Sequence, residues 1–230
     1  MKKILMIIMI ACSQLTFAST TEGLYVPLQY DNHYLHNHQK IHTDYISVVA
    51  EDISFPDYSQ LDLRQKARYE KAVAIIETVL NSDEFKRKVL SYKRSDGSRL
   101  YQKNYLWSNK AETLTNEEVL SVIIRGDEKM RPGTFNEMNI NSWVKKCNWW
   151  QRAGIWCRKV IGSTSPSSSF MIKHNWKFYK NYETHQMVAN IVHEWLHLLG
   201  FLHGNENMRE EVPYVVGSIA GEVAQQLLNE

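Results

Sequence analysis

Residues 184–203 read THQMVANIVHEWLHLLGFLH, and the apolar residues of this stretch recur at the spacing of an α-helix. They form one broad face, while His193 and His197 lie with other polar residues along a narrower stripe. Histidines spaced four apart project from the same side of a helix and can share one metal ion. Gly200 can then end the helix and let the chain reverse, which brings His203 toward the same ion. The stretch therefore predicts a buried helix whose end forms a three-histidine metal site.

Three neutral histidines are typical of a catalytic zinc site. They leave the fourth position of a tetrahedral zinc ion open to water, whereas a structural site fills all four positions with protein ligands. Glu194 lies one step round the helix from His193, beside the expected ion. The alternative is a core helix whose histidines hydrogen-bond one another. We favour the metal site, because burying three histidines and a glutamate without a metal leaves donors and acceptors in need of partners.

The stretch from His193 to His203 resembles the HExxHxxGxxH motif of the metzincin zinc metallopeptidases, with a looser match from about Gly154 to the C-terminus. The resemblance implies a single α+β domain of the zincin type, with a mixed sheet, an active-site helix and a C-terminal helix. It implies that His193, His197 and His203 bind Zn²⁺. It also implies that Glu194 is the general base of an endopeptidase that hydrolyses peptide bonds with a metal-activated water.

Downstream of His203 the chain departs from the metzincin pattern. Family members have a tight turn with a methionine beneath the metal, and here only Met208 follows His203. Residues 213–217, PYVVG, are an alternative position for this turn but contain no methionine. Tyr214 is a candidate for stabilising the transition state, as a tyrosine does in some members, and the alternative is a tyrosine packed in a turn. Glu222 is a rival third ligand of the thermolysin-like kind, but we favour His203 because of its place after the helix-ending turn.

We also consider a second class of function, in which the protein is not an enzyme. The chain would then be a non-catalytic exported zinc-binding or adhesion module that uses the metal only for stability. Glu194 argues against this alternative, because a structural site gains nothing from a base beside an open coordination position.

The N-terminus has the pattern of a secretory signal peptide. Residues 1–3, MKK, are basic, residues 4–11 are apolar, and residues 16–18, TFA, offer small residues for cleavage after residue 18. The apolar run is far shorter than the roughly 20 residues of a membrane-spanning helix. Cleavage before Cys12, which would then carry a lipid, is the alternative. We expect export to the periplasm or the medium, or a lipoprotein in the alternative case.

Cysteine usage agrees with export. Without Cys12, the pair Cys147 and Cys157 remains, ten positions apart. Metal binding by these two thiolates lacks partner ligands at close spacing. A structural disulfide is therefore predicted, and closing so short a loop contributes about 3 kcal/mol to stability.

Length and charge limit the remaining possibilities. The chain has 230 residues with 43% hydrophobic and 23% charged, which fits one globular domain rather than a disordered chain. Lys plus Arg is 27 and Asp plus Glu is 25, so removal of the two lysines of the signal segment leaves 25 of each. A neutral chain has no electrostatic affinity for nucleic acid, and a protein or peptide substrate is expected instead. The predicted parts are a signal peptide (1–18), a polar leader (19–44) and a metallopeptidase domain (45–230).

Other segments predict a sheet with helices packed against it. Residues 95–98, SDGS, predict a turn between segments able to pair as a hairpin, and Thr115 with Glu118 predicts a capping box that opens a helix ending before Gly126. The serine-rich residues 163–169 are expected to connect two strands. The metzincin resemblance implies that one of these strands, 154–162 or 169–174, is the edge along which an extended substrate binds. The further helices expected are 61–80, 83–91, 184–199 and 218–228, and the strands expected are 45–55, 154–162 and 169–174.

Overall fold

The computed structural model describes residues 44–55, 60–98, 100–101, 114–128, 134–147, 155–165, 169–203 and 208–229. All of them belong to one unit that spans residues 42–230. The predicted signal peptide, Cys12 and the leader up to residue 43 lie outside the described residues.

The helices and strands alternate irregularly along the chain. In chain order they are β1 (Ser47–Ser54), α1 (Gln60–Asn81), α2 (Asp83–Ser91), β2 (Leu100–Tyr101), β3 (Leu114–Thr115), α3 (Asn116–Arg125), β4 (Glu137–Lys145), α4 (Ile155–Lys159), β5 (Gly162–Ser165), β6 (Ser169–Asn175), α5 (Trp176–Tyr179), α6 (Thr184–Leu198), the 3₁₀ turn η3 (Met208–Glu210) and α7 (Val212–Asn229).

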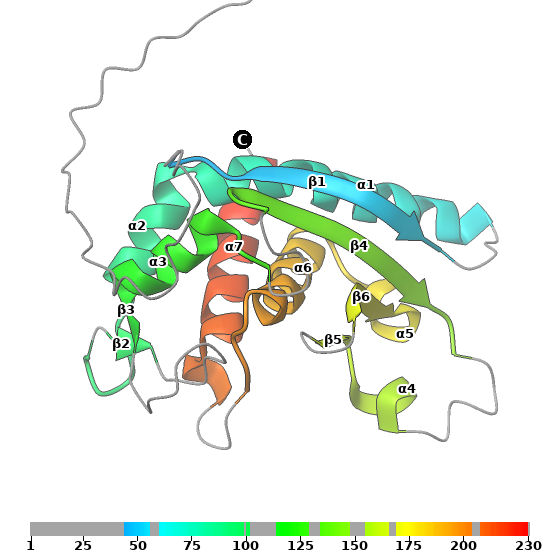
Figure 1. Cartoon of the computed structure of the whole chain (residues 1–230). Coiled ribbons are helices and arrows are strands. Elements are labelled where there is room, and N and C mark those ends of the chain that lie inside the picture. Colours follow the sequence, from blue (N-terminus) through cyan, green and yellow to red (C-terminus); the bar gives the residue numbers. More distant parts are fainter. Residues whose placement is uncertain are drawn as a thin grey trace, which may run out of the picture. The chain divides into compact units, whose positions relative to one another are not determined.

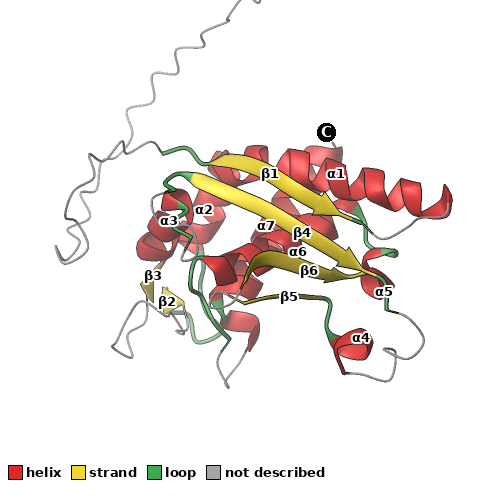
Figure 2. Cartoon of the chain, turned by 45° about the vertical axis from the view of Figure 1, so that its right-hand side comes forward, coloured by secondary structure: helices red, strands yellow, loops and turns green. Residues whose placement is uncertain are grey.

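The main sheet has four strands in the order β1-β4-β6-β5 (Figure 2). The first three strands are parallel, and β5 pairs antiparallel with β6 at one edge. A separate two-stranded sheet joins β2 and β3. The predicted mixed sheet with helices packed on it is confirmed at this level.

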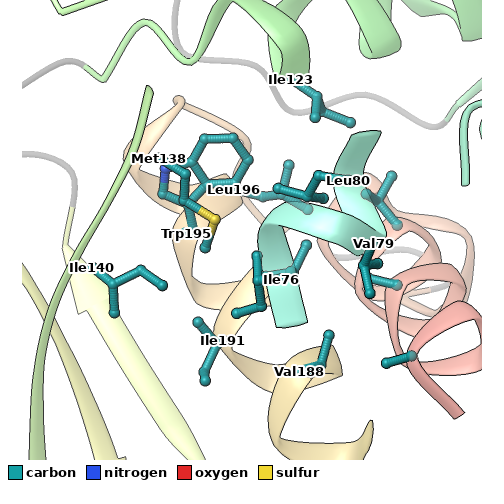
Figure 3. Close-up of a cluster of buried hydrophobic side chains, with 14 of the residues drawn as sticks. Ile76, Val79, Leu80, Ile123, Met138, Ile140, Val188, Ile191, Trp195 and Leu196 are labelled. Atoms are coloured by element: carbon teal, nitrogen blue, oxygen red, sulfur yellow. The ribbon is translucent and has the colours of Figure 1, made fainter. Parts of the chain in front are cut away.

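Helices α1, α6 and α7 lie on one side of the main sheet, and α6 packs most extensively against α7 (Figure 1). Apolar side chains from α1, α3, β4 and α6 meet between the helices and the sheet (Figure 3). Trp195 lies next to Met138 in this cluster, and both are fully buried. Each buried side chain of this size contributes about 1.5–3 kcal/mol to stability. The core therefore fixes the position of α6, the helix that carries the predicted site.

Several predictions from local patterns are confirmed. Strands β1 and β6 and helices α1, α2 and α6 lie within one or two residues of their expected ranges. In α3 the capping box is present, because Thr115 accepts from the Glu118 backbone N–H and Glu118 accepts from that of Thr115. Gly126 follows with φ +56°, the left-handed conformation that ends a helix.

The prediction of a strand at 154–162 is wrong. Residues 155–159 form the short helix α4, and the edge strand is β5, in the serine-rich stretch expected to be a connection. Its backbone pairs with β6, and the Thr164 hydroxyl donates to the carbonyl of Met171. Backbone pairing at a sheet edge needs no apolar side chains, so the pattern of residue types missed this strand.

The last helix and the expected hairpin also need correction. Helix α7 starts at Val212 and not near residue 218, so residues 213–217 are helical and do not form a methionine turn. The turn at 95–98 is present, with Gly97 at φ +83°, but β2 pairs with β3 and not with the residues before the turn.

The central strand β4 was not predicted. It carries buried polar residues, Asn139 and Ser142, which hide the apolar alternation of a strand. The Ser142 hydroxyl accepts from Tyr69, and the Asn139 backbone N–H donates to the buried Glu128 carboxylate, while Nδ2 of Asn139 has no hydrogen-bond partner among the described residues.

Cys147 and Cys157 form a disulfide, as predicted. The bond joins the residues that follow β4 to helix α4, which precedes β5. Among the described helices, none combines the length and the hydropathy that a membrane span requires.

Candidate metal centre

The end of helix α6 brings the three predicted histidines together. Gly200 adopts φ +101°, and the chain turns back through hydrogen bonds from Gly200 N–H to the His197 carbonyl and from Phe201 N–H to the Leu196 carbonyl. A residue with a Cβ rarely adopts such a φ, so the glycine is required at this turn. The turn directs the following residues toward the histidine stripe of α6.

Potential ligand atoms of His193, His197 and His203 all lie within 4.8 Å of one another. Their ring centroids are 5.2 Å apart for His193 with His197, 5.2 Å for His193 with His203, and 4.6 Å for His197 with His203. Two nitrogens bound to one tetrahedral zinc ion at about 2.1 Å lie about 3.4 Å apart. The ligand atoms therefore need to approach one another by roughly 1.4 Å or less to share an ion. This cluster could hold a metal ion.

Each of the three rings makes a hydrogen bond that orients it. Nδ1 of His197 lies 2.6 Å from the Phe201 carbonyl oxygen, and Nδ1 of His203 lies 2.8 Å from Oε2 of Glu211. His193 donates to the backbone carbonyl of Pro213. In metal sites an acceptor on one ring nitrogen fixes the tautomer and leaves the other nitrogen for the ion. The donor set thus fits a divalent metal, with Nε2 of His197 and His203 as ligand atoms.

Burial keeps the two helix histidines neutral. It lowers the pKa of His193 to about 3 and that of His197 to about 4, and neighbouring imidazoles act in the same direction. A neutral imidazole is the form that binds a metal. At neutral pH both rings are therefore ready to act as ligands.

Glu194 is buried beside the cluster, with 4% of its surface exposed. Burial raises the pKa of its carboxyl to about 8, while a hydrogen bond with the Asn190 side chain acts in the opposite direction. A cation held by the histidines would lower this pKa, because an opposite charge nearby favours the carboxylate. Glu194 has the environment of a carboxyl group that can both take up and release a proton near neutral pH.

Tyr214 stands beside the cluster on the first turn of α7. Its ring centroid is 4.6 Å from that of His193 and 5.0 Å from that of His203, and the residue is 41% exposed. Partial burial raises the pKa of Tyr214, and the carboxylates of Glu211 and Glu194 raise it further. The hydroxyl therefore stays protonated at neutral pH and is able to donate a hydrogen bond.

The rival ligand lies elsewhere. Glu222 is exposed on α7, and its carboxylate pairs with the Lys88 ammonium at 3.1 Å. It does not belong to the histidine cluster. Met208 begins the 3₁₀ turn η3 just before α7, and its side chain lies outside the described residues.

Three residues of the site were not predicted as such. Asn190 lies on α6 one turn before Glu194, and this spacing of two polar residues is a signal that could have found it. Glu211 and Gly162 have no signal in the sequence, because only the fold brings them to the cluster. A Cβ on Gly162 of β5 would lie 2.4 Å from Oε1 of Glu194, so the strand backbone lies directly against this carboxyl.

Comparison with known proteins adds no further assignment. No protein-family model, curated protein or solved structure matches the chain. The candidate metal centre therefore stands on the geometry of its three histidines and on the hydrogen bonds that orient them.

Proposed function

We propose that the protein is a zinc-dependent endopeptidase that resembles the metzincins, with Zn²⁺ bound by His193, His197 and His203. The observation that carries the proposal is the convergence of three imidazoles on one point, with a buried glutamate beside them. Imidazole ligands suit zinc, and three of them leave a coordination position for the reaction. When bound, zinc supplies a Lewis acid that makes a water molecule acidic near neutral pH and polarises a carbonyl group.

The residues of the chain supply the proton transfers and the charge stabilisation. Glu194 takes the proton from the attacking water and then passes it to the leaving amine, acting first as base and then as acid. Tyr214 donates a hydrogen bond to the oxygen on which negative charge develops. The partial exposure of Tyr214 supports this role, because a fully buried side chain could not contact a substrate.

Strand β5 is the proposed binding edge for an extended peptide. It is one of the two outer strands of the main sheet, and its first residue lies against Glu194. A peptide that pairs with this edge would pass its backbone beside the general base. Export remains part of the proposal, and the Cys147–Cys157 disulfide is compatible with it.

A Glu194→Gln variant tests the proposed enzyme. We expect the variant to bind zinc with an affinity within about threefold of the wild type and to lose peptide hydrolysis by at least about 100-fold, because the amide cannot take a proton. A peptide-library digest with the zinc-loaded protein measures hydrolysis, and competition with a chromogenic chelator measures binding. Near-full activity in the variant would remove the general-base assignment.

The alternative is a non-catalytic zinc-binding or adhesion module, and chelation separates the two. An enzyme loses cleavage with a chelator and recovers it with zinc. A binding module shows no cleavage at any metal loading, and only its thermal stability follows the metal.

A further inference from the structure

Asn190 connects Glu194 to a buried group of aromatic side chains. Oδ1 of Asn190 accepts a hydrogen bond from the Tyr179 hydroxyl at 2.6 Å and lies 3.3 Å from Nδ1 of His174. The same side chain hydrogen-bonds the Glu194 carboxyl one turn further along α6. Since the amide oxygen is directed to Tyr179 and His174, the NH₂ group is the part that can donate to Glu194.

The partners that orient the amide are themselves fixed. Tyr179 is 1% exposed and His174 is 0% exposed, and their rings lie 4.4 Å apart. Protonation of His174 on Nδ1 gives a donor to Oδ1 of Asn190, whereas protonation on Nε2 would leave a buried N–H without a partner among the described residues. The Nδ1–H form is therefore favoured, and both neighbours then donate to the same amide oxygen.

Strand β5 limits the space around the Glu194 and Asn190 side chains on the side opposite the aromatic group. A Cβ on Gly162 would lie 2.4 Å from Oε1 of Glu194 and 2.8 Å from Oδ1 of Asn190. The two polar groups thus lie between the β5 backbone and the aromatic group. This arrangement leaves the carboxyl little room to rotate.

We propose that Asn190 is a positioning residue whose side-chain amide donates to the Glu194 carboxylate and fixes its orientation toward a substrate on β5. Tyr179 and His174 act through Asn190 by directing its oxygen away from Glu194. The inference rests on the proposed peptidase function, since the orientation of a base matters to a reaction.

An Asn190→Asp variant tests the role in the zinc-loaded protein. Aspartate keeps an oxygen for Tyr179 but has no N–H to donate to Glu194. We expect kcat for a peptide substrate to fall by about 10- to 100-fold, because a small misplacement of a reacting group has effects of this size. The KM and the zinc dissociation constant should stay within about threefold of the wild type, because neither the β5 edge nor the histidines change.

The matched control is Asn116→Asp. Asn116 is also buried, and its Nδ2 donates to the carbonyls of Leu90 and Tyr92, at the start of α3 and outside the histidine cluster. Loss of these hydrogen bonds should lower the melting temperature and leave kcat of the folded protein within about twofold of the wild type. If Asn190→Asp reduces kcat no more than this control does, or if KM and zinc binding change in step with kcat, the positioning role is wrong.

Tyr179→Phe tests how the amide is oriented. The single variant should lower kcat by less than Asn190→Asp, and the double variant should be no more than about twofold below Asn190→Asp alone, because both act on one hydrogen bond. Losses that multiply would overturn the link from Tyr179 through Asn190.

Nuclear magnetic resonance separates this inference from the proposed function. In protein labelled with ¹⁵N-asparagine, the side-chain NH₂ signals of Asn190 should shift in Glu194→Gln and in Tyr179→Phe, whether or not any peptide is cleaved. If the wild type cleaves nothing, the proposed function fails, and these shifts still decide whether the hydrogen bonds exist. Unshifted signals that exchange with solvent at the rate of an exposed amide would overturn the inference even in an active enzyme.

Discussion

His203 and Glu222 are the two residues that compete for the role of third metal ligand. The orientation of His203 depends on Glu211, which is buried and accepts from Nδ1 of the ring. Glu222 is engaged with Lys88 on the exposed side of α7. The contacts of the two residues thus favour His203.

We therefore expect His203→Ala to weaken zinc binding by more than about 100-fold, since even the loss of an outer partner of a ligand costs 10- to 100-fold. Glu222→Ala should change it by less than about twofold, because an exposed ion pair contributes little to the structure. Chelator competition measures both constants, with far-UV circular dichroism to verify that each variant folds. A larger effect of Glu222→Ala would favour the thermolysin-like ligand set.

His174 gives the protein a dependence of stability on pH. Burial lowers the pKa of His174 from 6.5 to about 3, so between these values the unfolded chain binds a proton that the folded chain does not. Stability therefore falls as the pH falls, by up to about 1.4 kcal/mol per pH unit from this residue.

The comparison of wild type with His174→Asn isolates this effect. Asparagine does not titrate, and its amide can still donate toward Asn190. We expect urea unfolding at pH 6.5, 5.5 and 4.5, in the presence of a chelator, to show that the free energy of unfolding decreases less steeply with falling pH in the variant. The difference in slope should be about that contributed by one bound proton. Equal slopes would mean that His174 titrates alike in the folded and the unfolded chain.

At the scale of elements, the pair α6 and α7 builds the site. Two glycines of α7 allow close approach: a Cβ on Gly217 would lie 2.7 Å from the Ala189 carbonyl oxygen, and one on Gly221 would lie 2.9 Å from the Ala189 Cβ. The same helix carries Tyr214 and follows directly on Glu211. The spacing between the two helices thus sets the distance from these residues to the histidines.

Gly217→Ala tests this packing. In an exposed helix the change would stabilise the protein by up to about 1 kcal/mol, because alanine is the better helix former. Here we expect destabilisation by about 1–3 kcal/mol, since the methyl group meets backbone that cannot rotate away. Urea unfolding measures the effect, and Ser218→Ala, exposed on the same helix, should change stability by less than about 0.5 kcal/mol. A Gly217→Ala variant more stable than the wild type would mean that α6 and α7 can move apart without loss of stability.

At the scale of the whole molecule, one covalent bond restrains the segment between β4 and β5. The Cys147–Cys157 disulfide closes a loop of ten positions; Cys157 lies in α4, and β5 follows within a few residues. Neither cysteine belongs to the histidine cluster. The bond therefore acts on stability and on the chain that leads to β5, not on the metal ligands.

Reduction of the disulfide should lower the free energy of unfolding by about 3 kcal/mol, because the unfolded chain regains the freedom of the loop. Zinc affinity of the folded protein should stay within about threefold, since no ligand changes. Urea unfolding with and without reductant gives the first quantity, and a Cys147→Ala, Cys157→Ala double variant is the control. A stability that does not respond to reductant in the wild type would show that the pair is not bonded.

The sequence by itself determined the elements whose signals are local. The apolar spacing of α6, the histidines four apart, Gly200 and the capping box of α3 each depend on residues within a few positions of one another. Interactions of this range are present in any fold that contains the segment, so the pattern predicts them. The pairing of two cysteines ten apart is also nearly local.

Only the tertiary structure decided the order of the strands and the partners of the site. Strand β4 lies inside the sheet and carries Ser142, whose hydroxyl accepts from the distant Tyr69, and β5 forms mainly by pairing of its backbone with β6. Glu211 at His203, Gly162 at Glu194 and Tyr179 at Asn190 come from elements whose separation in the sequence carries no information about contact. These contacts depend on how the helices and the sheet pack, and packing is a property of the whole chain.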